Sequence, residues 1–396
     1  MSPTKLAEKL ASSLLEGSPC AGAEEAALKA LGFINPRGAW ENLKALTEKG
    51  GFPGEDSGFL KELLLAVADS FEPDRALNNL ERLAESLREP GELFRALGER
   101  SSREALLALF SGSQHLTDVL LQEPGYLAWL LEPSVLDASK TKEEMARELR
   151  GLLSEAGNHA ERLAALRRFR KREFLRIGAR DLTRRADLLE TTADISHLAD
   201  VCLEGAYESC YRELKRTHGA PRFPGPDGEE QECEFTVLAM GKLGGEELNF
   251  SSDIDILFLY SSDEGGTEGV EIEGLGRHQQ LTNHDFFVRL SQMLTAAMSE
   301  ITEEGALFRV DLRLRPEGQS GDIAYSLRSY EIYYESWGQT WERQAMLKVR
   351  PAAGSMSLGE SFVQMIQPFV YRKHLDFAAL DEIRAMKERI DRDLLK

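Results

Sequence analysis

The sequence contains few cysteines, and their spacing argues against two common uses of this residue. Its four cysteines form no Cys-x-x-Cys pair, and no histidines lie beside them at ligand spacing. A disulfide framework and a zinc site are therefore both disfavoured. We expect reduced, mostly buried thiols at Cys20, Cys202, Cys210 and Cys233.

Long apolar runs are also missing. No run approaches the roughly 18 residues that a membrane-spanning helix requires. Residues 1–19 are amphipathic, are interrupted by Lys5, Glu8 and Lys9, and lack the apolar segment of a signal peptide. These absences predict a protein without a membrane span, located in the cytoplasm.

Basic side chains are outnumbered by acidic ones. There are 48 Lys and Arg against 67 Asp and Glu, which gives a formal net charge of −19. Nucleic-acid backbones are bound mainly by clustered Lys and Arg, so this balance argues against a sequence-independent nucleic-acid binder. With 396 residues, of which 42% are hydrophobic and 29% charged, the chain otherwise has the composition of a soluble globular protein of about two or three domains.

One stretch carries a distinctive pattern. It reads Met240-Gly-Lys-Leu-Gly-Gly-Glu-Glu-Leu-Asn-Phe-Ser-Ser-Asp-Ile-Asp-Ile-Leu-Phe-Leu-Tyr260. Apolar runs at 235–240 and 254–260 flank a glycine-rich turn, which predicts a strand, a turn and a second strand. Because side chains alternate along a strand, we expect Asp253 and Asp255 on one face and the isoleucines beside them on the other.

The Asp253 and Asp255 carboxylates would repel each other and raise each other's pKa unless a cation lay between them. Hard divalent cations, chiefly Mg²⁺, bind carboxylate oxygens and leave positions open for phosphate oxygens. The glycines before the pair allow backbone N–H groups to approach an anion closely. The pattern therefore indicates metal-assisted phosphoryl or nucleotidyl transfer.

A second polar face is predicted in the strand Ala306-Leu-Phe-Arg-Val-Asp-Leu-Arg-Leu-Arg315, which a proline follows. Polar and apolar residues alternate along it, so one face would carry Asp311 between Arg309 and Arg313, with Arg315 beyond them. Forked guanidinium donors suit phosphate oxygens. The structural alternative is an ion pair of Asp311 with Arg309 or Arg313.

The glycine–aspartate stretch resembles the nucleotidyltransferase superfamily of the DNA polymerase β type. That superfamily shows an apolar residue, Gly, a small residue and, after a spacer, Asp-apolar-Asp. Met240, Gly241 and the Asp253–Asp255 pair match this pattern, whereas Lys242 departs from it. The resemblance implies a polymerase β-like fold for this part of the chain.

The lysine is what a narrower family shows. The pattern Gly-Lys-Leu-Gly-Gly-x-Glu-Leu-Asn-x-x-Ser-Asp-Ile-Asp resembles the glutamine synthetase adenylyltransferase family, whose members both add and remove adenylyl groups. Residues 247–249 and Ser252 are in register with it. Two other segments also resemble the family: the helix predicted at 169–182, and Trp341-Glu-Arg-Gln-Ala-Met-Leu-Lys-Val-Arg350.

Enzymes of this family have two nucleotidyltransferase halves, each with an Asp-x-Asp motif, and this chain contains one such motif. Its Asn249-Phe-Ser-Ser-Asp253 version and the segment 309–316 resemble the N-terminal, adenylyl-removing half. We therefore expect the chain to correspond to that half.

The resemblance implies a catalytic metal site formed by Asp253, Asp255 and Asp311, with Asp311 as the third carboxylate on a neighbouring strand. It implies two Mg²⁺ ions, with Mn²⁺ as an alternative. It also implies phosphate or nucleotide contacts from a wider set of residues: Lys242, Gly244, Gly245, Ser252, Arg313, Arg315 and Lys348.

The implied reaction is phosphorolysis, in which inorganic phosphate removes AMP from an adenylylated tyrosine of glutamine synthetase and ADP is released. The implied partners are glutamine synthetase, phosphate, ADP or ATP, and a PII signalling protein, with glutamine as a further effector. Three alternatives stay open: adenylylation with ATP, transfer to another protein or a small molecule, and a regulatory module that keeps the fold without metal.

The predicted fold class is α+β. Apolar spacings of three and four residues, separated by turn signals, predict a helical region over 1–200. A catalytic domain with a small mixed sheet is expected over 201–350, and a C-terminal helical segment over 351–396. Residues 333–350 are predicted as one helix, with Trp341 packed inside.

Four arginines recur every fourth residue, at Arg168, Arg172, Arg176 and Arg180, and would line one helix face. One interpretation is an anion-binding surface for phosphate or a modified protein loop. The alternative is a solvated face, or ion pairs with the acidic remainder of the chain, which charge runs usually form.

Overall fold

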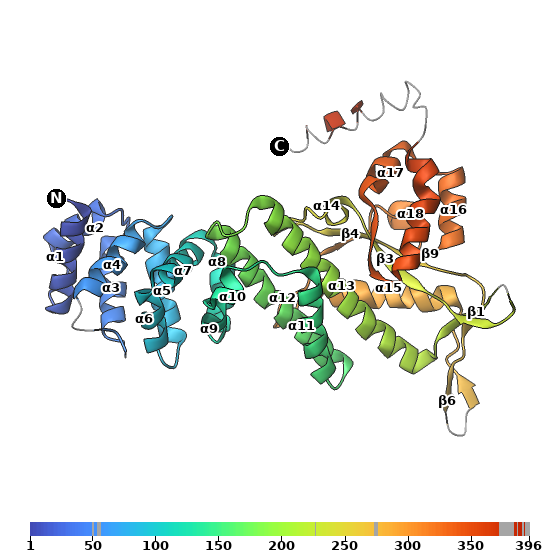
Figure 1. Ribbon diagram of the computed structural model, residues 1–396, viewed down its shortest axis with the longest axis horizontal. Helices are drawn as coiled ribbons and strands as arrows, with labels where there is room; N and C mark the ends of the chain where they lie inside the picture. The colour runs from blue at the N-terminus through green and yellow to red at the C-terminus, as the bar shows by residue number, and fades with distance from the viewer. Residues whose placement is uncertain are drawn as a thin grey trace. The chain divides into compact units, whose positions relative to one another are not determined.

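The computed structural model describes residues 1–49, 51–53, 57–225, 227–272, 276–371, 384–385, 387–389 and 392 (Figure 1). It divides into two compact units. The first contains Met1–Ser139 and Lys171–Thr191, and the second contains Lys140–Arg170 and Thr192–Lys396. The predicted α+β class is confirmed, whereas the functional domain limits stay a prediction.

The first unit is helical, as predicted. Proline at the first turn starts α1, α3, α5 and α10, where its missing N–H is not needed, and the side chains of Ser2, Asn35 and Ser113 cap α1, α3 and α8. Its helices are α1 (Pro3–Leu15), α2 (Gly22–Ala30), α3 (Pro36–Thr47), α4 (Ser57–Ala68), α5 (Pro73–Ser86), α6 (Gly91–Gly98), α7 (Arg100–Gly112), α8 (Gln114–Gln122), α9 (Tyr126–Leu130) and α10 (Pro133–Leu136).

Two long helices, α12 (His159–Leu182) and α13 (Leu188–His218), contribute residues to both units. The remaining elements belong to the second unit: α11 (Lys142–Glu155), β1 (Pro221–Pro224), β2 (Glu230–Glu232), β3 (Phe235–Ala239), α14 (Gly241–Gly244), β4 (Ile254–Tyr260), β5 (Gly266–Thr267), β6 (Val270–Ile272), β7 (Gly276–His278), α15 (Asn283–Ser299), β8 (Val310–Asp311), η1 (Gly318–Ser320), β9 (Ala324–Ser326), α16 (Leu327–Ser336), α17 (Thr340–Ala345), η2 (Met346–Lys348), β10 (Arg350–Gly354) and α18 (Met356–Val370).

The main sheet is mixed and has the order β10-β3-β4-β8, with β9 also paired to β4. β3 is antiparallel to both β10 and β4, whereas β8 and β9 run parallel to β4. Every residue of β4 is buried except Asp255, which is half-buried. The predicted strand–turn–strand around the aspartate pair is therefore confirmed, with the one-turn helix α14 inside the turn.

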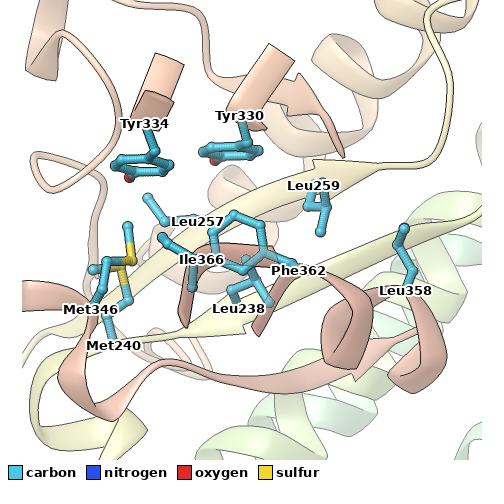
Figure 2. Close-up of a cluster of buried hydrophobic side chains, with 10 residues drawn as sticks. All are labelled: Leu238, Met240, Leu257, Leu259, Tyr330, Tyr334, Met346, Leu358, Phe362 and Ile366. Carbon is cyan, nitrogen blue, oxygen red and sulfur yellow. The ribbon is translucent and has the colours of Figure 1, made fainter. Parts of the chain in front are cut away.

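Both faces of this sheet are covered. On one face, alternate residues of β3 and β4 pack against α16 and α18, together with Met240, which follows β3, and Met346 of η2. Figure 2 shows the cluster: Leu238, Met240, Leu257, Leu259, Tyr330, Tyr334, Met346, Leu358, Phe362 and Ile366. On the other face, Phe287 of α15 stacks on Phe235 and Tyr260, with ring centroids 5.5 and 4.9 Å apart. By strand alternation, the Asp255 side chain lies on the same face of the sheet as this apolar cluster but does not belong to it.

Replacing Phe362 with Ala is expected to lower the free energy of unfolding of the second unit by about 3–5 kcal/mol. The ring is fully buried and packs edge-on against Tyr330 at 5.1 Å, so its removal leaves a cavity. Native-state hydrogen exchange of the β3 and β4 amides measures the change. Ile332→Ala on α16 is the control: its side chain is 47% exposed, and we expect a loss of under about 1 kcal/mol. Equal losses in the two variants would contradict the packing account.

The strand predicted over 306–315 is wrong in length, because β8 contains only Val310 and Asp311. The Asp311 carboxylate accepts a hydrogen bond from the Arg313 backbone N–H at 2.8 Å, and the Arg315 N–H donates to the Leu312 carbonyl at 3.2 Å. These local bonds turn the chain away from the sheet directly after Asp311.

The single helix predicted over 333–350 is also wrong. It is replaced by α16, α17, η2 and the start of β10, with a break at Gly338, where an added Cβ would lie 2.5 Å from the Phe369 ring. α17 starts afresh with a capping box between Gln339 and Glu342. Trp341 is 39% exposed, so its predicted packing is wrong, and Glu342 is the buried residue of this helix.

Three of the regularly spaced arginines lie in the first unit, and none of the three forms a solvated face. Arg172 stacks over Trp129 at 4.9 Å. Arg176 is 2% exposed and pairs with Glu173 at 2.8 Å, and Arg180 donates to the Leu136 carbonyl at 2.7 Å. The fourth, Arg168, lies in the second unit, 3.5 Å from Glu304. The ion-pair interpretation is therefore the one that the structure supports.

Two expectations from composition are tested directly. All four cysteines are free thiols, and three of them are buried, as predicted. Among the described residues, none of the helices combines the length and the apolar character that a bilayer crossing requires.

Candidate functional site

Three carboxylates lie at one edge of the main sheet. Asp255 of β4 is the register partner of Asp311 of β8 across a parallel pair, so the two side chains leave the sheet on the same face. Asp253 immediately precedes β4, where the buried Ile254 alternates with it. This placement agrees with the expected proximity of Asp253, Asp255 and Asp311, whose catalytic role stays a prediction.

The surroundings of Asp255 and Asp311 shift the pKa values of these two carboxyl groups in opposite directions. Burial raises the pKa of Asp255 to about 6, and the negative charges of Asp311 and Asp253 add to this increase. Asp311 behaves in the opposite way, because hydrogen bonds from the Arg313 guanidinium lower its pKa. Arg313 and Lys242 offset the increase at Asp255 only in part, so the charge of this carboxylate is incompletely balanced.

Two exposed arginines compensate the other two carboxylates. The Arg309 Nε pairs with Asp253, and the Arg313 Nε donates to both Asp311 oxygens at 2.8 and 3.0 Å. The side chains of Arg309 and Arg313 are 73% and 72% exposed. The ion-pair alternative therefore holds for Asp311 with Arg313. Asp253 is 34% exposed, so its pair with Arg309 contributes little to stability. Asp311 is 11% exposed, so its charge depends more on Arg313.

The residues fit a hard divalent cation by donor chemistry. They supply only carboxylate oxygens, Asp255 and Asp311 share one face, and the charge of Asp255 is incompletely balanced. Within the described ranges no three His, Cys, Asp or Glu side chains are already gathered as a metal site. Asp253 and Asp311 have Arg309 and Arg313 as their present ion-pair partners.

The glycine turn, residues 241–245, approaches the Asp255 side chain closely at Gly241. Gly241 has φ +55°, and a Cβ added there would lie 2.5 Å from the Asp255 Oδ2. Gly244 is equally tight, since its Cβ would lie 2.3 Å from the Lys348 carbonyl oxygen. Both positions need glycine for close approach. Gly241 was missed as a site residue in the sequence, although its place beside Lys242 in the motif is the signal that marks it.

The remaining predicted phosphate-binding residues lie at different distances from this edge. Lys242 is close enough to Asp255 to lower the pKa of that carboxyl. Lys348 pairs with Glu247 beside Gly245, and Ser252 directly precedes Asp253. Their contacts with phosphate stay a prediction.

Arg315 contacts the backbone of its own loop, and its predicted contact with phosphate stays a prediction. Its guanidinium donates to the carbonyls of Leu312, Gly321 and Gln319 at 3.0, 3.3 and 3.3 Å. These bonds close the loop that follows β8. The structure therefore gives Arg315 a contact that orders this loop, and the more exposed Arg309 lies nearer to the carboxylates.

The chain is similar to a defined set of known proteins. The family model described as glutamate-ammonia ligase adenylyltransferase matches residues 103–365, from α7 into α18. A relative from Pseudomonas aeruginosa is 42% identical over 284 residues, which is 72% of this chain and 28% of that protein. Relatives from Hahella chejuensis and Nitrosococcus oceani are 40% and 35% identical, over 73% and 81% of this chain and 29% and 32% of theirs.

Each of these relatives is named a bifunctional glutamine synthetase adenylyltransferase/adenylyl-removing enzyme. The matched segment spans less than a third of the length of each of them. Residues 103–365, which the family model matches, include the three carboxylates and the glycine turn.

Proposed function

The chain belongs to the glutamate-ammonia ligase adenylyltransferase family, and from this premise we propose that it is a metal-dependent nucleotidyltransferase acting on glutamine synthetase. The observation that supports the proposal most directly is the in-register pairing of Asp255 with Asp311, beside Asp253. Three neighbouring carboxylates beside a glycine turn form an edge that suits a nucleotide phosphate and its metal ions.

We propose adenylyl removal as the direction of the reaction. The basis is the resemblance of the sequence 249–253 and of the segment 309–316 to the adenylyl-removing half of the family. In this reaction an oxygen of inorganic phosphate forms a bond to the phosphorus of tyrosine-bound AMP. The bond from that phosphorus to the tyrosine oxygen breaks, ADP leaves, and the tyrosine oxygen takes up a proton.

The chemistry requires alignment and charge neutralisation more than covalent help. Asp253, Asp255 and Asp311 would hold Mg²⁺, which supplies positive charge to the phosphorus and to a leaving oxygen whose reference pKa is about 10. Arg309 and Arg313, once released from their carboxylates, present forked donors at the same edge for phosphate oxygens. The glycine turn keeps bulky side chains away from Asp255.

The partners of this proposal are adenylylated glutamine synthetase, inorganic phosphate, and ADP or ATP. A PII protein and glutamine, implied as effectors by the family resemblance, stay predictions without an assigned surface.

The test is incubation of the protein with adenylylated glutamine synthetase, Mg²⁺ and ³²P-labelled phosphate. Labelled ADP is the expected product. Transfer of labelled AMP from ATP to unmodified glutamine synthetase, without ADP formation from phosphate, would instead establish the adenylylating direction. Absence of both reactions in a folded preparation that binds no metal would leave only the regulatory module.

Mg²⁺ is expected to stabilise the wild-type protein against thermal unfolding and to leave Asp253→Asn unaffected. A ligand that binds only the folded state stabilises it by about 2.7 kcal/mol at a hundred times its dissociation constant. Thermal unfolding over a series of Mg²⁺ and Mn²⁺ concentrations measures the shift. Chelation is expected to abolish ADP formation, and re-addition of the metal to restore it. A shift of the same size in Asp253→Asn would place the cation elsewhere.

A further inference from the structure

The Asp200 carboxylate on α13 is buried completely and has two cationic partners. Its side chain has 0% exposure, and it accepts hydrogen bonds from the Lys142 Nζ at 2.6 Å and from the Arg350 Nη1 and Nη2 at 2.7 and 3.2 Å. A buried carboxylate needs such partners, because an unpaired charge in the interior is strongly destabilising. One cationic partner would balance the charge of Asp200, and this carboxylate has two.

The two cations differ in what else they touch. The Arg350 Nη2 also donates to the Leu243 carbonyl at 2.9 Å. Leu243 lies in α14, the one-turn helix that begins at Gly241, the residue in close approach to Asp255. Lys142 comes from α11 and has no hydrogen bond to this turn among the described contacts. Arg350 therefore connects Asp200 to the glycine turn of the candidate site, whereas Lys142 does not.

A second residue of α13 holds the same loop at its other end. Ser196, one helical turn before Asp200, accepts a hydrogen bond from the Leu248 N–H at 3.0 Å, and both residues are fully buried. One turn after Asp200, Glu204 accepts the Gly354 N–H at 2.7 Å and so fixes β10, the strand that carries Arg350. A single face of α13 thus fixes the glycine turn and the strand that supports it.

We propose that Asp200 is a positioning residue: acting through Arg350, it holds the Leu243 carbonyl and so sets the place of the glycine turn against Asp255. The kinetic part of this inference rests on the proposed function, whereas the structural part does not. Its mechanism depends on the fork of the guanidinium, which bonds a carboxylate and a carbonyl at once. A lysine at the same position keeps the charge and lacks the fork.

The test compares Arg350→Lys with Lys142→Met. Arg350→Lys keeps a cation beside Asp200 without the fork, and Lys142→Met leaves Arg350 as its cationic partner. Asp200 therefore keeps at least one cation in each variant, and both are expected to fold. Arg350→Lys is expected to raise the hydrogen-exchange rates of the Gly244, Gly245 and Glu247 amides at least about tenfold, since these amides form the internal bonds of the turn. Lys142→Met is expected to leave these rates within about twofold of wild type. Equal rates in the two variants, or an increase only in Lys142→Met, would overturn the inference.

The kinetic arm separates this inference from the proposed function. In the labelled-phosphate assay, Arg350→Lys is expected to lower kcat about 10–100-fold with little change in the KM for adenylylated glutamine synthetase, because misplacement of the site by a fraction of an ångström affects the reacting geometry. Lys142→Met is expected to retain the wild-type kcat. A wild-type protein without activity counts against the proposed function, and the exchange rates then decide the positioning role by themselves. Wild-type activity with equal kcat in both variants counts against the positioning role alone.

Discussion

Asp255→Asn is expected to lower the rate of ADP formation about a thousandfold, the largest effect of any single change at this site. Asp255 is the central carboxylate of the three: it is the register partner of Asp311 and is close enough to Asp253 for that charge to raise its pKa. A metal ion at a phosphoryl group contributes several kcal/mol to the transition state, and each 1.4 kcal/mol or so is a factor of about ten in rate. The labelled-phosphate assay measures the loss directly.

The same substitution is not expected to destabilise the protein. The pKa of Asp255 is raised to about 6, whereas an unfolded Asp titrates at about 3.9, so the folded state binds the proton more tightly. In metal-free solution the stability that this proton contributes is complete below about pH 4 and is lost as the pH rises through about 6. Asn is neutral at all these values, so Asp255→Asn should be at least as stable as wild type at pH 8, with a flatter stability profile between pH 4 and 7.

Asp322→Asn is the matched control, because the Asp322 carboxylate belongs to the same unit and is 63% exposed. Its activity is expected to stay within about twofold of wild type, as for surface changes away from a site. If Asp255→Asn formed ADP at the rate of this control, the Asp255 carboxylate would have no role in the mechanism. If Asp255→Asn lost activity only because it unfolds, its amide hydrogen-exchange rates would rise as well.

The part of the site that could be predicted from the sequence is the part that depends on local alternation. The strand of seven residues has one polar position, Asp255, and Asp253 directly precedes it, as the alternating sequence suggested. The parallel pairing of Asp311 with Asp255 agrees with the implied third carboxylate, although β8 is much shorter than its alternating sequence suggested. Alternation cannot show where a side chain ends a strand by accepting a hydrogen bond from the backbone two residues later, as Asp311 does from the Arg313 N–H.

The part that could not be predicted depends on contacts between distant segments. The bond from Arg350 to Asp200 joins residues 150 positions apart, and the one from Arg350 to Leu243 joins residues 107 apart. No local pattern encodes such pairs. The choice of Asp253 as the partner of Arg309 is similar, because it follows from the parallel alignment of β8 with β4, which leads the chain past Asp253 just before the strand begins.

Gly241→Ala is expected to reduce ADP formation about a hundredfold while leaving the sheet intact. The residue has φ +55°, where a side chain costs roughly 1–2 kcal/mol of backbone strain. The methyl group would in addition lie 2.5 Å from the Asp255 Oδ2, so the turn or the carboxylate must move. A displacement of about 1 Å at reacting groups is enough for a loss of this size. Activity and the hydrogen exchange of β3 and β4 amides, measured together, separate misplacement from unfolding.

Gly305→Ala separates backbone strain from collision with Asp255. Gly305 also has a positive φ, +85°, and lies in the same unit, but nothing lies within 4 Å of an added Cβ. Its alanine variant should therefore show the strain alone, as a stability loss of about 1–2 kcal/mol, and keep nearly full activity. If both alanine variants lost activity equally, strain would explain the effect and the contact between the turn and Asp255 would have no catalytic meaning. If only Gly241→Ala lost activity, the result would support a role for the close approach of the turn to Asp255, since an added Cβ meets this carboxylate at Gly241 and meets nothing at Gly305.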